Sequence, residues 1–347
     1  MTINTKLIRD FLTTLRLPSG LSVTDFLATI RSEDDKIHVI FEADQSRLKE
    51  AEDVRSFAET ALKKEYPSYQ ILCALLAARP KSESSLQSLQ NVSHIVAVAS
   101  GKGGVGKSTT TVNLAIAMTH LGYKVGILDA DIYGPSLPTM MGLTEKPDVN
   151  SDKKLMPAMA HGVACMSIGL LIPADTPMVW RGPMVQGALI QLLKDVAWGE
   201  LDVLLIDMPP GTGDVQLSLA QQANLSGAVI VSTPQDIALI DARKGLAMFD
   251  KVAVPILGII ENMSVFSCPN CGHESHIFSH GGAKATAQDL GVPFLGEIPL
   301  TLSIRQGADT GNVNIHKDVT ILYQPIAQKI LSQLAIPTRS MPTIKMK

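Results

Sequence analysis

The residues that most directly indicate chemistry stand together between Gly101 and Thr109. The segment reads Gly-Lys-Gly-Gly-Val-Gly-Lys-Ser-Thr and satisfies the phosphate-loop pattern G-x-x-x-x-G-K-[ST]. Glycines let the backbone curl so that several N–H groups point at one anion, and the following helix N-terminus adds its dipole. We therefore predict that this chain binds a nucleoside triphosphate. The predicted phosphate-binding residues are Gly101, Lys102, Gly103, Gly104, Val105, Gly106, Lys107, Ser108 and Thr109, with Lys107 on the β- and γ-phosphates and Ser108 on Mg²⁺.

Two aspartates close the apolar run that follows the phosphate loop and its helix, in Leu128-Asp129-Ala130-Asp131. A carboxylate at such a strand end faces the γ-phosphate and can orient the attacking water. We assign that role to Asp131, and we expect Asp129 to support Mg²⁺ or the neighbouring loop. The alternative is that either aspartate only caps the turn before Gly134.

A third aspartate, Asp207, ends the apolar run 204–206 and is followed by Met208 and then Pro-Pro-Gly-Thr-Gly. A buried strand at this position would deliver Asp207 to the Mg²⁺ coordination sphere, through water, because Mg²⁺ keeps several of its waters. Gly211 can place its N–H against the γ-phosphate and move away after hydrolysis. A simple strand-end cap is the alternative for Asp207.

Asn262 ends another apolar run and is the candidate for recognition of the base. A carboxamide both donates and accepts hydrogen bonds, as the edge of adenine requires. The chain has no Asn-Lys-x-Asp segment of the kind that recognises guanine, which favours ATP. A turn-capping asparagine is the alternative.

Cys268 and Cys271 form a Cys-x-x-Cys pair shortly after Asn262. Two thiolates at this spacing can bind one metal, but they do not complete a tetrahedral zinc site or a [4Fe–4S] cluster. The missing ligands could be His273, His276 and His280, or the same pair from a second subunit, because a two-fold axis turns one pair into four thiolates. A redox dithiol is a further alternative, and spacing alone leaves iron and zinc open.

These residues need a scaffold that brings the ends of several strands together. From residue 94 onward apolar strands alternate with helical stretches, which predicts a mostly parallel sheet covered by helices on both faces. Ligands of such sheets bind beyond the carboxyl ends of the strands, where all of these motifs lie. The fold class is therefore α/β, a P-loop NTPase. Predicted strands are 94–100, 124–129, 163–169, 201–207, 227–233, 255–261 and 293–298.

The sequence pattern also divides the chain into regions. Residues 1–80 predict a small α+β domain with a helix from Ile3 to Leu15, a strand over 37–43, a helix over 48–64 and a further apolar run over 69–78. Residues 81–93 read as a linker, 94–336 as the ATPase domain with the Cys-x-x-Cys pair, and 337–347 as a flexible tail.

Composition narrows the class of protein. Among 347 residues, 46% are hydrophobic and 18% charged, which is enough for a large core. The net charge of −3 provides no general attraction to nucleic acid or acidic membranes, so neither is expected as a partner. Four unevenly spaced cysteines do not form a secreted disulfide framework. No apolar run approaches the ~18 residues of a membrane span, and no signal pattern is present, so we expect a cytoplasmic protein.

Lys102 is not needed by an ordinary phosphate loop, where it would be a solvated lysine. The pattern G-K-G-G-V-G-K-S-T resembles the deviant phosphate-loop class, which includes cell-division and plasmid-partition ATPases and the nitrogenase iron protein. In that class the second lysine crosses a dimer interface to the other subunit's nucleotide. The resemblance therefore implies a face-to-face homodimer.

Residues from about 92 to 335 resemble the Mrp/ApbC family of iron–sulfur cluster carrier ATPases. The resemblance rests on six segments in family order: 101–109, 129–136, 180–184 (Trp-Arg-Gly-Pro-Met), 207–214, 261–263 and the cysteine pair. It implies a homodimer that holds a [4Fe–4S] cluster through both cysteine pairs, receives it from a cluster-assembly scaffold and passes it to apo iron–sulfur proteins. Slow hydrolysis of ATP to ADP and phosphate would accompany loading or release.

The same resemblance assigns roles residue by residue. Lys102 would contact the partner's γ-phosphate, and Lys107, Ser108 and Thr109 the phosphates and Mg²⁺. The two switch aspartates are Asp131 and Asp207, the adenine contact is Asn262, and the cluster ligands are Cys268 and Cys271. The role of Arg181 is inferred from its position and not from the resemblance. It precedes a predicted helix and would either lie near the nucleotide or the partner, or pack at the start of that helix.

The N-terminal domain resembles a small domain fused to bacterial members, but it lacks that domain's acidic segment and cysteine. Leu17-Pro18-Ser19-Gly20-Leu21 stands in place of the acidic segment, so we expect partner docking rather than cluster binding there. Two other classes remain open from the residues alone: a zinc-stabilised positioning or partition-type ATPase, and a redox ATPase like the nitrogenase iron protein, whose cysteines lie far apart in sequence.

Overall fold

The structure is a computed structural model, and it describes residues 5–17, 20–33, 36–43, 47–77, 89, 91–172, 182–313 and 317–334. The chain forms two compact units, Met1–Ser84 and Ser85–Lys347. Trp180 and Arg181, most of the predicted linker 81–93 and the predicted tail lie outside the described residues. The predicted linker runs too far, because a strand already begins at Val92. None of the described helices is long and apolar enough to cross a membrane.

The first unit is a three-stranded sheet with two helices. Strands β1 and β2 pair antiparallel and β2 and β3 parallel, in the order β1-β2-β3. Its core joins Ile8 and Leu12 of the first helix to Ile37, Val39 and Phe41 of the central strand. The elements are α1 (Thr5–Thr14), β1 (Leu27–Glu33), β2 (Lys36–Ala43), α2 (Leu48–Glu65) and β3 (Gln70–Ala77).

The second unit is built on a nine-stranded sheet. Its strands are β4 (Val92–Ala99), β5 (Val125–Asp129), β6 (Ala158–Ala160), β7 (Val163–Ser167), β8 (Leu201–Asp207), β9 (Gly227–Ser232), β10 (Ile256–Ser267), β11 (Glu274–Ser275) and β12 (Phe294–Leu300). Its helices are α3 (Lys107–His120), α4 (Leu137–Met141), α5 (Gly182–Asp195), α6 (Asp214–Gln222), α7 (Asp236–Lys251), α8 (Gly282–Leu290), α9 (Leu302–Thr310) and α10 (Lys317–Gln333).

The sheet has the order β11-β10-β9-β4-β8-β5-β7-β6, with β12 also paired to β10. Only the edge strands β6 and β11 pair antiparallel among the described strands of this sheet, so the prediction of a mostly parallel sheet is confirmed. The sequence explains the arrangement, because continuous apolar strands suit a sheet that is covered on both faces.

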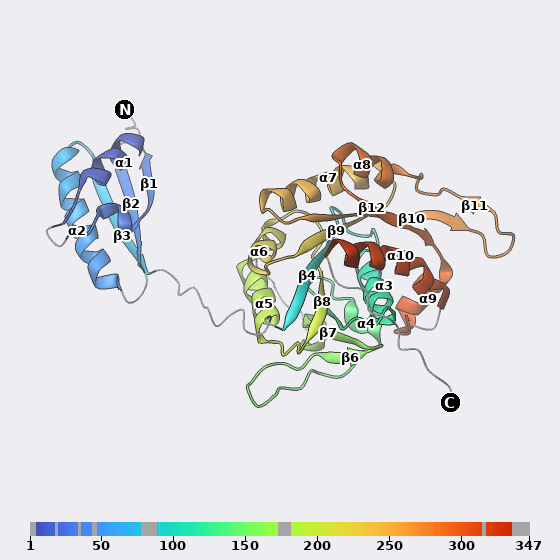
Figure 1. The fold of residues 1–347 in the computed structure, drawn as a ribbon. Coiled ribbons are helices and arrows are strands. Elements are labelled where there is room, and N and C mark those ends of the chain that lie inside the picture. The colour runs from blue at the N-terminus through green and yellow to red at the C-terminus, as the bar shows by residue number, and fades with distance from the viewer. Residues whose placement is uncertain are drawn as a thin grey trace. The chain divides into compact units, whose positions relative to one another are not determined.

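Helices cover both faces of this sheet (Figure 1). Successive strand residues point to opposite faces, so Leu204 and Ile206 pack with α5, α6 and α7, whereas Val203 and Leu205 pack with α3, α4 and α10. The apolar side of α10 is buried, with Tyr323 fully inaccessible to solvent, so its apolar run serves the core.

The prediction for the strand over 255–261 was too short. Strand β10 continues to Ser267, and its last two residues pair antiparallel with β11 in a hairpin that projects from the body of the unit (Figure 1). Phe266 also stays paired with Leu300 of β12. Residue Met263 adopts φ 56°, and the register with β12 shifts between Asn262 and Phe266. A bulge of this kind re-aims a strand, and hydrophobic pattern alone did not predict it. The short or edge strands β1, β6 and β11 were also not predicted.

Candidate nucleotide site and cysteine hairpin

The phosphate loop lies between β4 and α3, where the sequence predicted it. Gly106 precedes the first residue of α3 and has φ 81°, a left-handed conformation that glycine adopts without strain. A Cβ atom at Gly106 would lie 2.2 Å from Nδ2 of Asn262, so this position has no room for a side chain. The loop therefore depends on glycine here for both its backbone angle and its packing.

Lys107 and Asp207 form a buried ion pair across the site. The Lys107 Nζ lies 2.6 Å from Oδ1 of Asp207, and their side chains are only 6% and 3% exposed. The same Nζ donates to Oγ of Ser108 over 3.2 Å, and the Thr111 hydroxyl donates to the same Asp207 oxygen over 3.2 Å. The fold thus brings Asp207 together with the predicted lysine and serine, although Lys107 and Asp207 are 100 positions apart in the sequence.

Asp129 lies beside this pair and organises the loop that follows β5. Its carboxylate accepts hydrogen bonds from the backbone N–H of Asp131 (3.1 Å), the N–H of Leu137 (3.2 Å) and the hydroxyl of Ser167 (3.0 Å). Burial, and then the charge of Asp207, raise the pKa of Asp129 to about 7. Its contacts match the loop-supporting role that we expected.

Asp131 stands on that loop and is partly exposed. Burial raises the pKa of its carboxyl, and the positive charge of Lys107 acts in the opposite direction. The Asp131 carboxylate also accepts from backbone N–H groups of Tyr133 and Gly134, which is the turn-capping contact considered as its alternative role. Asp131 therefore lies within electrostatic reach of Lys107, the predicted phosphate-binding lysine, and it also supports its own turn.

The predicted switch residue Gly211 contacts the start of the phosphate loop. Its backbone N–H donates to the carbonyl of Ser100 over 3.2 Å, and it has φ 98°. The Ser100 hydroxyl in turn donates to the carbonyl of Lys102 over 2.9 Å. The Lys102 side chain is exposed and has no ion pair within the part of the chain that the structure describes. These bonds join the 209–214 segment directly to the loop.

Asn262 lies under the phosphate loop. It is buried, and its Nδ2 donates to the carbonyl of Val105 over 2.8 Å. One function of this side chain is therefore to anchor the loop to β10. The predicted contact with adenine stays a prediction, for which the amide retains one N–H and its oxygen.

The two cysteines lie in the turn of the β10–β11 hairpin. The Cys268 N–H donates to the His273 carbonyl over 2.9 Å, and the Gly272 N–H donates to the Cys268 carbonyl over 2.8 Å. Both thiols are free, with Cys268 partly exposed and Cys271 exposed. Backbone N–H groups of Asn270 and Cys271 lower the pKa of Cys268, because they stabilise its thiolate. The turn thus favours the thiolate, the form that binds metal.

The three nearby histidines do not gather around these thiols. Among the described residues, the one group of three or more candidate metal ligands within 4.8 Å consists of Glu261, His280 and Glu297, and it contains neither cysteine. The rings of His276 and His280 pack against each other, 4.4 Å between centroids. The described residues of one chain therefore provide two thiolates without a local histidine partner.

Sequence reasoning missed several residues of the site. Ser167 and Thr111 hold the two buried aspartates, but an isolated hydroxyl in an apolar element has no distinctive pattern. Glu261 does carry a detectable signal, because its carboxylate directly follows the apolar residues Ile259 and Ile260 in a buried strand.

A mostly parallel sheet that carries a phosphate-loop segment and a buried lysine–aspartate pair at its strand ends is typical of a P-loop NTPase. A family model described as the NUBPL iron-transfer P-loop NTPase, of the ParA group, matches residues 91–335, and the chain belongs to this family. The predicted resemblance is thereby confirmed. The N-terminal unit lies outside the match.

Curated relatives agree with this assignment. The chain is 55% identical over 251 residues to an Arabidopsis thaliana protein named "Iron-sulfur protein required for NADH dehydrogenase, mitochondrial", with 71% of this chain and 80% of the relative covered. It is 52% identical over 251 residues to the Escherichia coli K12 iron-sulfur cluster carrier protein, with 71% and 68% covered.

Solved structures support the fold. A nucleotide-binding protein from Archaeoglobus fulgidus, in complex with ADP and with cobalt found, is 40% identical with a TM-score of 0.62, over 71% of this chain and 98% of that one. The Pyrococcus furiosus cell division ATPase MinD is 25% identical with a TM-score of 0.53, over 69% and 99%.

Proposed function

We propose that this protein is an ATP-hydrolysing carrier of iron–sulfur clusters, which binds a [4Fe–4S] cluster between two copies of the chain and transfers it to apoproteins. The observation that carries the proposal is the position of the cysteine pair. Cys268 and Cys271 stand at the tip of a projecting hairpin whose strand also anchors the phosphate loop through Asn262. The names of the relatives are the reason for proposing an iron–sulfur cluster as the cargo.

In this proposal, nucleotide binding separates the buried ion pair of Lys107 and Asp207. The ammonium of Lys107 would bind the triphosphate in the loop, and the carboxylate of Asp207 would then be free to bind Mg²⁺. The hydroxyl of Ser108 and the carboxylate of Asp207 are hard oxygen donors near Lys107 Nζ, a donor set that suits Mg²⁺. Bound Mg²⁺ would neutralise charge on the phosphates. Asp131 would orient the attacking water, Gly211 would contact the γ-phosphate, and Lys102 would reach the partner's nucleotide.

Each chain would contribute half of the cluster site. A [4Fe–4S] cluster takes four thiolates, and a two-fold axis supplies four from two copies of one exposed pair. The lowered pKa of Cys268 supports thiolate ligation. Acceptors would be apo iron–sulfur proteins, and a cluster-assembly scaffold would be the donor. Cluster binding needs both cysteines in the reduced form, which a reducing compartment maintains, and this agrees with the cytoplasmic location expected from the sequence.

We propose residues 94–336 as the ATPase domain and residues 1–80 as an accessory domain that docks partners. ATP hydrolysis can change the affinity of the dimer for the cluster only if ATP and ADP favour two different states of the dimer. Strand β10 and the 209–214 segment both contact the phosphate loop, so they are the candidates to pass such a change to the cysteine hairpin.

The test is anaerobic cluster reconstitution followed by transfer to an apo acceptor. Cys268→Ala/Cys271→Ala should lose bound iron and transfer while it retains ATP binding, and Cys73→Ala, in the other unit, should behave as wild type. A full complement of iron in the double variant would overturn the carrier function. Zinc in place of iron in anaerobically purified protein would favour the zinc-stabilised class.

A separate experiment tests the coupling between ATP hydrolysis and cluster release. The rate of cluster release should differ when the protein binds ATP, ADP or a non-hydrolysable analogue. Equal release rates with all three would exclude a link between hydrolysis and the cluster.

A further inference from the structure

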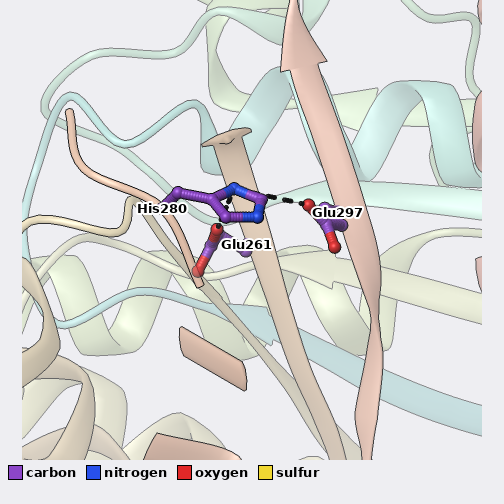
Figure 2. Close-up of side chains that lie close together, drawn as sticks. All are labelled: Glu261, His280 and Glu297. Atoms are coloured by element: carbon purple, nitrogen blue, oxygen red, sulfur yellow. Dashed lines mark ion pairs between the residues drawn. The ribbon is translucent and has the colours of Figure 1, made fainter. Parts of the chain in front are cut away.

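Three ligand-type side chains converge beside the cysteine hairpin, from three different segments. Glu261 belongs to β10 and Glu297 to the adjacent parallel strand β12, where the two residues are register partners. His280 lies in the segment that returns from the hairpin to α8. Its Nδ1 is 4.0 Å from Oε1 of Glu261 and 3.8 Å from Oε2 of Glu297, so the imidazole stands between the two carboxylates (Figure 2).

The charge of this group is unbalanced. Two carboxylates directly opposite each other on neighbouring strands repel, and neither forms an ion pair with lysine or arginine among the described residues. His280 is their shared partner among the described residues. The arrangement therefore favours a cation between the three side chains.

The carboxylate of Glu261 is already held in a fixed orientation by hydrogen bonds. It is fully buried, and its two oxygens accept hydrogen bonds from the N–H groups of Gly281 and Ala283, both over 2.8 Å. These bonds fix the carboxylate at the N-terminus of α8, and each oxygen keeps a further lone pair. Fixed outer hydrogen bonds of this kind orient metal ligands.

We propose that Glu261, His280 and Glu297 bind a divalent transition-metal ion, at a site separate from the cysteine pair. Their candidate ligand atoms all lie within 4.8 Å of one another. Ligand bonds of about 2.0–2.2 Å need a somewhat closer set. His280 and Glu297 have side chains that are 48% and 42% exposed, so metal binding would require small rotations of these two partly exposed side chains. Water would fill the remaining positions.

The donor set selects the metal. One imidazole and two carboxylates suit Mn²⁺, Fe²⁺, Co²⁺ or Zn²⁺, whereas soft Cu(I) prefers thiolates. The ion would fasten the segment that returns from the cysteine hairpin to β10 and β12. Because Glu261 directly precedes Asn262, the ion would also lie one residue from the anchor of the phosphate loop. The site does not depend on cluster binding.

The test uses the full chain with Cys268→Ser/Cys271→Ser, free of nucleotide and Mg²⁺, so that no thiolate competes. Titration with Mn²⁺ followed by electron paramagnetic resonance should show one tightly bound ion per chain, with a hyperfine coupling to an imidazole nitrogen. His280→Gln and Glu297→Gln each remove a proposed ligand atom, so each should weaken binding by at least about 10–100-fold, the cost of losing a residue that only orients a ligand. His280→Gln should also remove the nitrogen coupling.

Controls separate this site from others. His273→Gln and Glu274→Gln, exposed on the same hairpin, should leave Mn²⁺ binding unchanged. Ser108→Ala removes a predicted Mg²⁺ ligand and keeps the buried Lys107–Asp207 pair, so it should also leave this Mn²⁺ binding unchanged. Glu261 is not substituted in this test, because it anchors the N-terminus of α8 and its loss would disturb the fold. The proposal is overturned if millimolar Mn²⁺ leaves no bound ion, or if binding persists with nitrogen coupling in His280→Gln.

Discussion

The side-chain amide of Asn262 donates a hydrogen bond to the carbonyl of Val105 over 2.8 Å, and this bond joins the strand of the cysteine pair to the phosphate loop. Both residues are buried. The strand then passes through the left-handed residue Met263 and reaches Cys268 at the hairpin turn. One strand therefore contacts the predicted nucleotide site near its middle and carries the predicted cluster ligands just beyond its end.

Asn262→Ala should weaken nucleotide binding. Loss of the bond leaves the buried carbonyl of Val105 unpaired, which costs about 1–2 kcal/mol of folding stability, and the phosphate loop that has lost this anchor should bind nucleotide more weakly. Isothermal titration with ATP and GTP measures both effects. A general loss of affinity reflects the loop anchor, and a weaker preference for ATP over GTP reflects a lost base contact. Unchanged affinity for both nucleotides would contradict the anchoring role.

Lys107→Ala should destabilise the fold as well as abolish ATP binding. Removal of one partner from a buried ion pair leaves the charge of Asp207 uncompensated next to Asp129, at a cost of about 3–5 kcal/mol. Urea denaturation without nucleotide gives the change in unfolding free energy. Lys102→Ala is the matched control, because Lys102 is exposed and its loss should leave stability within about 0.5 kcal/mol of wild type. Equal stability of both variants would contradict the structural importance of the pair.

Gly106→Ala should disable the phosphate loop. The new Cβ would overlap Nδ2 of Asn262, and alanine would be strained at φ 81°. ATP affinity and the melting temperature should both fall. Gly104→Ala is the comparison, because Gly104 has the same φ of 81° and a Cβ atom there would meet no atom within 4 Å, so this variant isolates strain from overlap. A smaller effect at Gly106 than at Gly104 would contradict the role of the overlap.

Asp129 should make stability depend on pH. Its pKa in the folded protein is about 7, against an ordinary value of 3.8, so folding favours its protonated form. The stability due to this proton is fully present below pH 3.8 and is lost as the pH rises through about 7. Relative to Asp129→Asn, the unfolding free energy of wild type should fall across this range and then level off. A constant difference across the range would contradict a raised pKa.

The sequence predicted the features that follow from local pattern. The phosphate loop, its flanking strand and helix, and the parallel sheet come from glycine spacing and continuous apolar runs, and the structure contains them. The confirmed family followed from six short motifs in order.

Long-range geometry was not predictable in the same way. The Lys107–Asp207 pair depends on the neighbouring positions of β4 and β8 in the sheet, which spacing does not encode. The partnership of Glu261 with Glu297 depends on the register of β10 and β12. The bulge at Met263, which directs the cysteine hairpin, has no hydrophobic signature.

The central claim is that two chains share one cluster through Cys268 and Cys271. The most direct measurement is the mass of the anaerobically reconstituted protein in solution, combined with iron and sulfide analysis and Mössbauer spectroscopy of the same sample. We predict a dimer with about four iron and about four sulfide ions per two chains, and a monomer without cluster for Cys268→Ala/Cys271→Ala. A monomer that carries a complete cluster would contradict the account.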